Sequence, residues 1–141
     1  MLMTIEEILQ LSKDKKTSDI HIAPGNPLML RIDGTLQPQG FEVLSDKDTA
    51  AILGPIIPEE LRDELEREGE LDFAFSRPGF SRIRANVFRQ RGSYAAALRV
   101  LSFDIPEPQT LGIPESVVKL TKLMRGLVLV KGATGSGKST T

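Results

Sequence analysis

The sequence predicts an α+β domain over residues 1–100, an interdomain linker over 101–114, and the beginning of an α/β domain over 115–141. Up to residue 100, helical capping patterns are interspersed with short segments of alternating apolar and polar residues, which is typical of a sheet covered by helices. Three prolines within 102–114 then indicate an extended connection. After this linker, an apolar run enters a glycine-rich loop, as at the start of a parallel α/β sheet.

Capping patterns predict the helices of the first half. Capping boxes at residues 4–7 and 45–48 begin helices that are expected to run to Lys16 and to about Leu53. A third helix, charged and exposed to solvent, is predicted over 58–68, because this segment opens with proline and acidic residues and is followed by a glycine.

The strands are predicted from alternation and from the turns between them. Turns that contain Pro-Gly, Asp-Gly and Arg-Gly separate neighbouring strands, which favours antiparallel hairpins. The predicted strands cover residues 18–23, 28–33, 35–37, 71–76, 81–90 and 93–101. In the last segment, a short helix is predicted over 115–124. A continuous apolar strand of the buried, parallel-sheet type follows over 127–130.

Composition excludes several classes of protein. The chain has no cysteine, which excludes a disulfide scaffold, a thiolate zinc site and a cysteine nucleophile. Its single histidine, His21, argues against a histidine-based metal cluster. No apolar run approaches the roughly 20 residues that a membrane-spanning helix needs, and the acidic N-terminus is not a secretory signal. We therefore expect a cytoplasmic protein without direct membrane insertion.

The formal net charge of −1 hides an asymmetry between the two halves. Residues 1–70 contain 7 basic and 15 acidic residues, a net charge of −8, whereas residues 71–141 contain 11 basic and 4 acidic residues, a net charge of +7. Two interpretations are open. The basic half binds a polyanion, or acidic helices and basic strands attract each other.

The strongest motif lies near the C-terminus. Residues 132–139 read Gly-Ala-Thr-Gly-Ser-Gly-Lys-Ser, which fits the phosphate-binding loop G-x-x-x-x-G-K-[ST]. Glycines allow successive backbone N–H groups to point at phosphate oxygens. Lys138 is expected to reach the β- and γ-phosphates of ATP, and the Ser139 hydroxyl to bind Mg²⁺. The alternative is a glycine-rich surface turn. The predicted nucleotide contacts are Gly132, Thr134, Gly135, Ser136, Gly137, Lys138, Ser139 and Thr140.

A phosphate-binding loop is only part of an ATPase. Hydrolysis also needs an acidic residue in the magnesium shell and a group that orients the attacking water, and both normally come from strands after the loop. The sequence stops at Thr141. We therefore expect it to be a fragment of a larger protein that does not hydrolyse ATP efficiently by itself.

A basic strand–turn–strand offers a second candidate site. Its candidate residues are Arg82, Arg84, Arg89 and Arg91, and Arg99 follows within 18 residues of the first. One interpretation is a solvated face whose arginines pair with the acidic helices. A second is a nucleic-acid surface, for which exposed aromatic residues are few. A third is phosphate recognition in trans, with arginines that reach the nucleotide of a neighbouring domain or subunit.

Taken together, these motifs resemble the PilT family of type IV pilus retraction ATPases, within the wider secretion ATPases. The resemblance spans nearly the whole chain. It rests on S-D-I-H-I at 18–22, R-I-D-G at 31–34, R-I-R-A-N-V-F-R-Q-R-G at 82–92, L-R-V at 98–100, L-G-I-P at 111–114 and G-L-V-L-V-K-G-A-T-G-S-G-K-S-T-T at 126–141. The sequence begins directly with this module, which favours the retraction type over the assembly type.

The resemblance implies a PAS-like N-terminal domain followed by a RecA-like ATPase domain whose first strand and P-loop end this chain. It implies a homo-hexamer that binds ATP and Mg²⁺ between the two domains, and arginines at 82, 84, 89 or 91 that approach the phosphates. The motor would act at the inner face of the inner membrane, on a pilus platform protein, with no nucleic-acid partner. The alternatives are a type II or type IV secretion or pilus-assembly ATPase of the same superfamily, and a non-enzymatic interaction or sensor module.

Overall fold

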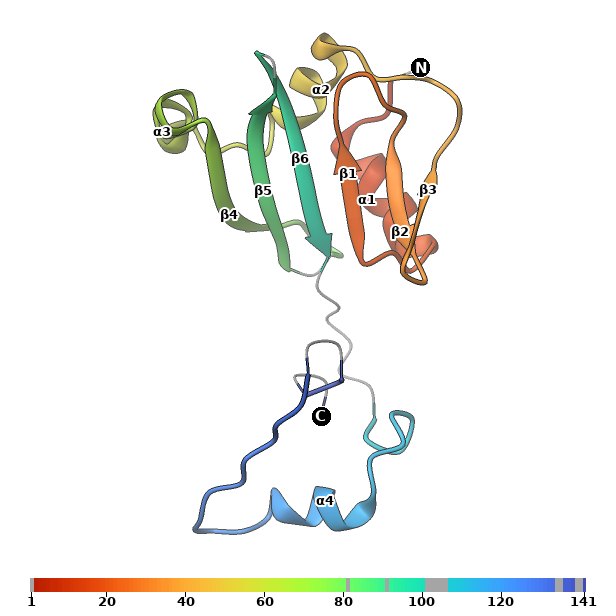
Figure 1. Ribbon diagram of the computed structural model, residues 1–141, viewed down its shortest axis with the longest axis vertical. Coiled ribbons are helices and arrows are strands. Elements are labelled where there is room, and N and C mark those ends of the chain that lie inside the picture. The colour runs from red at the N-terminus through yellow and green to blue at the C-terminus, as the bar shows by residue number, and fades with distance from the viewer. Residues whose placement is uncertain (1, 81, 91, 101–106, 134–135, 139–140) are drawn as a thin grey trace. The chain divides into compact units, whose positions relative to one another are not determined.

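The computed structural model describes residues 2–80, 82–90, 92–100, 107–133, 136–138 and 141. The chain divides into two compact units, Met1–Phe103 and Asp104–Thr141. The first unit contains the sheet and most of the helices, and the second contains one short helix and the glycine-rich loop (Figure 1).

A six-stranded antiparallel sheet forms the centre of the first unit. Its strand order is β3-β2-β1-β6-β5-β4, so two three-stranded meanders meet where β1 pairs with β6. In that pairing Ile20 lies opposite Leu98. The bounds are β1 Asp19–Ile22, β2 Met29–Ile32, β3 Thr35–Pro38, β4 Glu70–Ser76, β5 Arg82–Gln90 and β6 Ser93–Val100. The strands and hairpins predicted from alternation are therefore confirmed, with shifts of one residue at their ends; the predicted ends at 81 and 101 lie outside the described residues.

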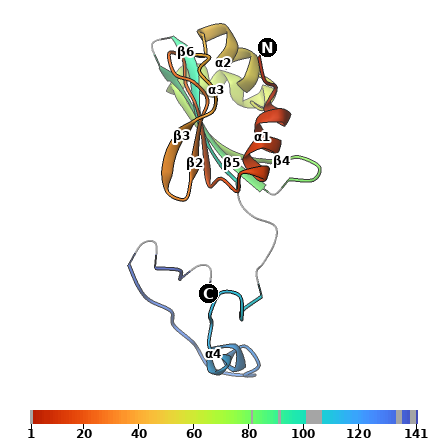
Figure 2. The same ribbon diagram turned by 90° about the vertical axis from the view of Figure 1, so that its right-hand side faces the viewer.

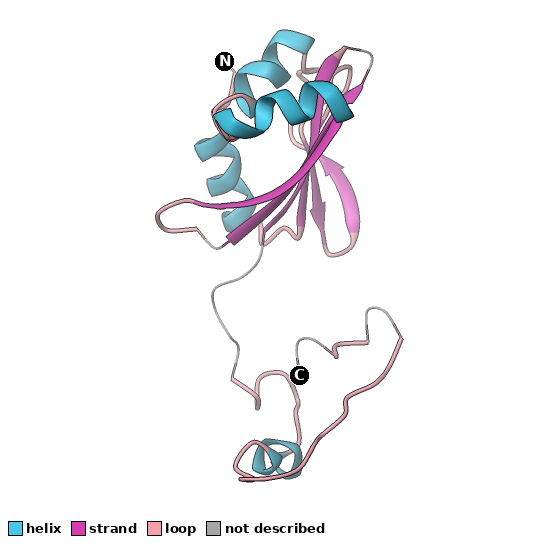
Figure 3. Ribbon diagram, turned by 90° about the vertical axis from the view of Figure 1, so that its left-hand side faces the viewer, coloured by secondary structure: helices cyan, strands magenta, loops and turns pink. Residues whose placement is uncertain are grey.

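Helices cover one face of this sheet, as the two side views show (Figures 2 and 3). They are α1 Ile5–Asp14, α2 Asp46–Leu53 and α3 Arg62–Glu68, preceded by a 3₁₀ turn, η1 Glu59–Leu61. The predicted helix over 58–68 thus begins as a 3₁₀ turn. It ends at Gly69, which adopts the left-handed φ of 81° that favours glycine.

Both predicted capping boxes form. The Glu7 carboxylate accepts a hydrogen bond from the Thr4 backbone N–H at 2.7 Å, and the Thr4 hydroxyl accepts one from the Glu7 N–H at 3.3 Å. Ser45 and Asp48 repeat the arrangement at the start of α2. These bonds satisfy backbone donors that have no partner inside a helix.

The hydrophobic core lies between the helices and the sheet. Strand alternation divides the side chains between the two faces: Ile20 and Ile22 of β1 are fully buried, as are Ile83, Ala85 and Val87 of β5. The intervening side chains of these strands lie on the opposite face, which the helices of this unit leave uncovered (Figure 3). Polar residues of β1, β5 and β6 therefore share one open surface.

The second unit differs from its prediction. Its helix, α4 Glu115–Leu120, is shorter than the predicted span of 115–124. Residues 127–130 form no strand, and their side chains are 53–81% exposed. The prediction of a buried first strand of an α/β domain was therefore wrong for this structure. A parallel strand is held by hydrogen bonds to neighbouring strands, and the described part of this unit contains no other strand.

Within the described residues, no helix combines the length and the apolar character needed to cross a bilayer.

Candidate functional site

The glycine-rich loop is described at residues 132–133 and 136–138. A Cβ at Gly132 would lie 2.5 Å from the Ser136 hydroxyl oxygen, so a side chain there would require this hydroxyl to leave its hydrogen bond with the Ala133 carbonyl. Gly137 has a φ of +85°, a conformation that residues with a side chain rarely adopt. Gly137 is thus favoured by the local path of the chain, and Gly132 leaves room for the Ser136 hydroxyl. Thr134, Gly135, Ser139 and Thr140 lie outside the described residues.

The Lys138 side chain folds back onto this loop. Its Nζ atom donates a hydrogen bond to the Ala133 carbonyl at 2.7 Å, and the Ser136 hydroxyl donates to the same carbonyl at 2.7 Å. The ammonium group is therefore held beside the tight backbone bend. A positive charge beside a backbone of this kind fits an anionic phosphate group. Ser139, the predicted ligand of Mg²⁺, is outside the described residues, so the magnesium contact stays a prediction.

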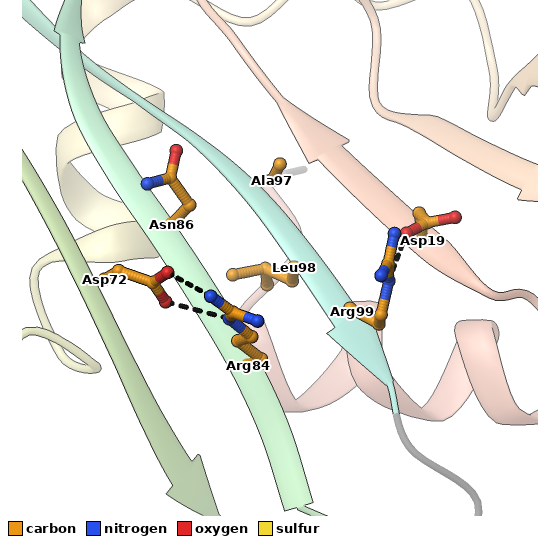
Figure 4. Close-up of a pocket in the computed structure, with 7 residues that line it drawn as sticks. All are labelled: Asp19, Asp72, Arg84, Asn86, Ala97, Leu98 and Arg99. Carbon is orange, nitrogen blue, oxygen red and sulfur yellow. Dashed lines mark hydrogen bonds and ion pairs between the residues drawn. The ribbon is translucent and has the colours of Figure 1, made fainter. Parts of the chain in front are cut away.

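The open face of the sheet carries a second cluster of charged groups, shown in Figure 4. Arg84 of β5 binds Asp72 of β4 through two hydrogen bonds, from Nε to Oδ1 at 3.1 Å and from Nη2 to Oδ2 at 2.6 Å. This two-point contact uses the whole Nε–Nη2 edge of the guanidinium. The hydrogen bond from Arg84 lowers the pKa of Asp72, so the pair is ionised at neutral pH.

Asp19 of β1 sits between two further arginines of the same face. Arg99 of β6 donates from Nε to Asp19 at 3.1 Å, and Arg31 of β2 forms an ion pair with it at 3.4 Å. The Ser18 hydroxyl donates a third contact at 2.7 Å. Burial by itself would raise the pKa of Asp19, but the hydrogen bonds from Ser18 and Arg99 and the two guanidinium charges lower it overall.

These two pairs border a polar hollow of about 230 Å³ on the sheet. We call it the arginine hollow. Arg84 lies directly opposite Arg99 in the β5–β6 pairing, and the small side chain of Ala97 lies opposite Asn86. The Arg84–Asp72 pair lies on one side of this hollow, and the Arg99–Asp19 pair lies on the other (Figure 4). The residues that line the hollow are Asp19, Asp72, Arg84, Asn86, Ala97, Leu98 and Arg99.

The four predicted arginines do not form one cluster. Arg82 and Arg84 share the open face, and the exposed side chain of Arg82 has no hydrogen bond or ion pair with the part of the chain that the structure describes. Arg89 lies on the other face, where it pairs with Glu66 of α3, and the Tyr94 hydroxyl donates to the same carboxylate at 2.6 Å. Arg91 is outside the described residues.

The interpretation that arginines pair with acidic helices therefore holds for Arg89 and not for Arg84. Three charged residues of the arginine hollow were not predicted as site residues: Asp19, Asp72 and Arg99. These residues come together through the register of the strands, which pairs Asp19 with Arg99 although they are 80 residues apart in the sequence. Alternation within each strand assigns a face but does not identify the residue on the neighbouring strand.

The similarity to known proteins extends over both units of the chain. The type IV pilus retraction ATPase PilT of Pseudomonas aeruginosa is 37% identical over 139 residues, which are 99% of this chain and 40% of that protein. The type IV pilus ATPase PilU of the same bacterium is 35% identical over 138 residues, which are 98% of this chain and 36% of PilU. The chain spans between 36% and 42% of the length of the curated relatives that it matches. No protein-family model matches it.

Solved structures agree with this result. A crystal structure of the pilus retraction motor PilT with bound ADP matches with a TM-score of 0.83 and 45% sequence identity, over 98% of this chain and 40% of that one. The Legionella pneumophila ATPase DotB, at 24% identity and a TM-score of 0.59 over 98% of this chain and 40% of that one, shares the fold. The antiparallel sheet with its helices is therefore the fold of the N-terminal region of PilT-type ATPases, and the chain is a homologue of this region.

Proposed function

We propose that this PilT-family chain is the N-terminal module and P-loop of a motor ATPase that couples ATP hydrolysis to retraction of type IV pili, the movement known as twitching motility. The observation that carries the proposal is similarity to a PilT ATPase along 99% of the chain, P-loop included. In this proposal the sheet unit is PAS-like, and the P-loop opens a RecA-like domain. The 141-residue chain is expected to be inactive alone.

The phosphate-binding loop has a defined task in this proposal. Lys138, which rests on the Ala133 carbonyl, exchanges that partner for the β- and γ-phosphate oxygens of ATP. The backbone N–H groups of residues 132–140 surround the phosphates, and the Ser139 hydroxyl holds Mg²⁺, which neutralises charge on the transferred group. The glycines at 132 and 137 support this assignment, because Gly137 adopts a positive φ at the bend and Gly132 leaves room for the Ser136 hydroxyl.

The arginines of the sheet unit act in trans. Among the four candidates, Arg82 and Arg84 are favoured, because both lie on the uncovered face where a nucleotide bound to another domain or subunit has access to them. Arg89 is held by Glu66 beside α3 and is better placed to stabilise the fold. An arginine supplied in trans stabilises charge on the transferred phosphate and raises the rate by orders of magnitude.

The assembly proposed is a homo-hexameric ring that works at the cytoplasmic face of the inner membrane, on the platform protein of a pilus. A secretion or pilus-assembly ATPase of the same superfamily is the second candidate, favoured by the fold shared with DotB. The two differ in the machine they drive and not in the chemistry of the P-loop.

The test replaces Lys138 in the whole protein that carries this chain. Lys138→Ala is expected to reduce ATP turnover to background and to abolish pilus retraction, because the γ-phosphate loses the positive charge of the lysine. Lys131→Ala is the matched control, since it removes a lysine of the same segment outside the motif, and it should retain turnover. Normal turnover by Lys138→Ala would refute the assignment of the P-loop. Loss of turnover in Lys138→Ala without any effect on pilus retraction would favour the secretion ATPase.

A further inference from the structure

The two aspartates of the arginine hollow are held very differently. Asp19 has a side chain that is 16% exposed, and it is bound by donors from three places in the sequence: Ser18, Arg99 and Arg31. Asp72 has a side chain that is 45% exposed, and Arg84 is its partner in the hollow. Asp19 is therefore a fixed part of the sheet, whereas the Asp72 contact is open to exchange with solvent ions.

Asp72 also occupies the part of Arg84 that an incoming anion would use. A guanidinium binds a carboxylate or a phosphate most strongly through two parallel N–H bonds. Both bonds of the Nε–Nη2 edge of Arg84 already go to Asp72. A phosphate group that takes this edge must therefore displace the carboxylate.

The exposure of the pair permits such an exchange. Both side chains of the Asp72–Arg84 pair are accessible to solvent and salt, which screen their attraction, and a doubly charged phosphate offers the same two-point contact with a larger charge than the carboxylate. The Arg84 side chain is 66% exposed, so it can turn toward the hollow without unpacking the core. Arg99 and Arg82 lie on the same face, so positive charge remains nearby when Asp72 is released.

We propose that Asp72 is a built-in competitor for phosphate: it holds the binding edge of Arg84 until an anionic phosphate oxygen replaces it. The proposal rests on the proposed function, since it takes Arg84 as a residue that contacts phosphate. As a consequence, Asp72 raises the phosphate concentration that is needed for a phosphate group to bind Arg84. When no phosphate is bound, Asp72 keeps the Arg84 side chain in a defined position.

The test measures binding of inorganic tripolyphosphate to the full 141-residue chain by calorimetry, at an ionic strength of about 0.15 M, where charges beyond about 8 Å are screened. Every sample carries Lys138→Ala, so that the P-loop lysine does not contribute. Asp72→Asn is expected to tighten binding by about threefold, the scale of one exposed ion pair. Asp72→Ser is a second variant of the same kind, and urea unfolding of each variant confirms that the sheet is intact.

Glu68→Gln is the matched control. It removes the same charge and a similarly exposed ion pair, with Arg67 at 2.8 Å on α3, outside the hollow. This control should leave the affinity unchanged, and Arg84→Gln should remove the gain when it is combined with Asp72→Asn. Three results would overturn the competitor role. The first is a gain in tripolyphosphate affinity from Asp72→Asn that persists when Arg84→Gln is added, and the second is an equal gain in affinity from Glu68→Gln. The third is no detectable binding by Asp72→Asn.

The outcomes separate this inference from the proposed function. If Arg84→Gln alone weakens binding while Asp72→Asn gives no gain, Asp72 is not a competitor and Arg84 keeps its phosphate role. If Arg84→Gln leaves the tripolyphosphate affinity unchanged both with Asp72 present and in the Asp72→Asn variant, the competitor role and the assignment of Arg84 to phosphate both fail.

Discussion

Asp19 illustrates how one residue connects the two halves of the sheet. Its carboxylate lies on β1, between Arg31 of β2 and Arg99 of β6, at the seam where the two meanders meet. The flanking guanidinium groups stabilise the ionised form and lower its pKa, against the opposing effect of burial. The charge of Asp19 should therefore stabilise the fold itself, besides any role it has beside the arginine hollow.

This lowered pKa predicts a pH dependence of stability. A carboxyl group whose pKa is lower in the folded protein contributes stability above its unfolded value, near 3.9, and loses it as the pH falls through the folded pKa. Asp19→Asn should therefore destabilise the sheet unit at neutral pH, and its difference from the wild type should shrink below about pH 4. Urea unfolding measured by fluorescence of Tyr94, the single tyrosine, reports on this unit.

Exposed Glu60→Gln serves as the control for this pH series, and it should follow the wild type at every pH. An Asp19→Asn difference that is the same at pH 3 and pH 7 would show that the side chain acts through shape or hydrogen bonding and not through its charge.

Sequence reasoning predicted candidate arginines but not their partners. The spacing of Arg82 and Arg84, two residues apart on a strand, predicts that they share one face, and the structure confirms this. The bond between Arg84 and Asp72 depends on the β4–β5 register, in which these residues are diagonal neighbours. Alternation alone does not encode that register, because it is set by the geometry of the turn between β4 and β5 together with the packing of the core face.

At the scale of single elements, a sequence pattern predicts a structure correctly when the interactions that form the structure join residues close in the sequence. The capping box of α1 joins residues only three positions apart, so its sequence pattern determines its structure. The apolar run at 127–130 is the opposite case. Its composition predicts a buried strand, but a strand requires a neighbouring strand, and its side chains are exposed in the structure.

The cap of α1 gives a direct test of this view. Thr4→Ala removes the hydroxyl that accepts the Glu7 N–H and should destabilise the sheet unit by about 1 kcal/mol in urea unfolding, a typical value for an N-cap. Thr4→Ser retains an oxygen at the same position, so it should recover most of that loss. If serine and alanine were equally destabilising, the methyl group of Thr4 and not its hydrogen bond would be the stabilising feature.

At the scale of the whole molecule, the chain contains a P-loop and a separate arginine face, which the proposed function assigns to the nucleotide sites of different subunits. The P-loop belongs to the second unit, and the arginine face belongs to the first. In a ring of identical subunits, arginines supplied in trans make each site depend on two copies of the chain. The arrangement predicts that two different inactive variants can complement each other.

Mixed rings of the whole protein test this dependence. Lys138→Ala has a defective P-loop and intact arginines, whereas Arg84→Gln has an intact P-loop and lacks the favoured arginine. Each variant alone should show little ATP turnover. Rings reassembled from both should recover a fraction of wild-type turnover, because some interfaces then combine an intact P-loop with an intact Arg84. A mixture of Arg84→Gln with the double variant Arg84→Gln/Lys138→Ala should recover none, since no interface then contains both residues. Mixed rings that form but stay inactive at every ratio would show that Arg84 does not serve the nucleotide of a neighbouring subunit.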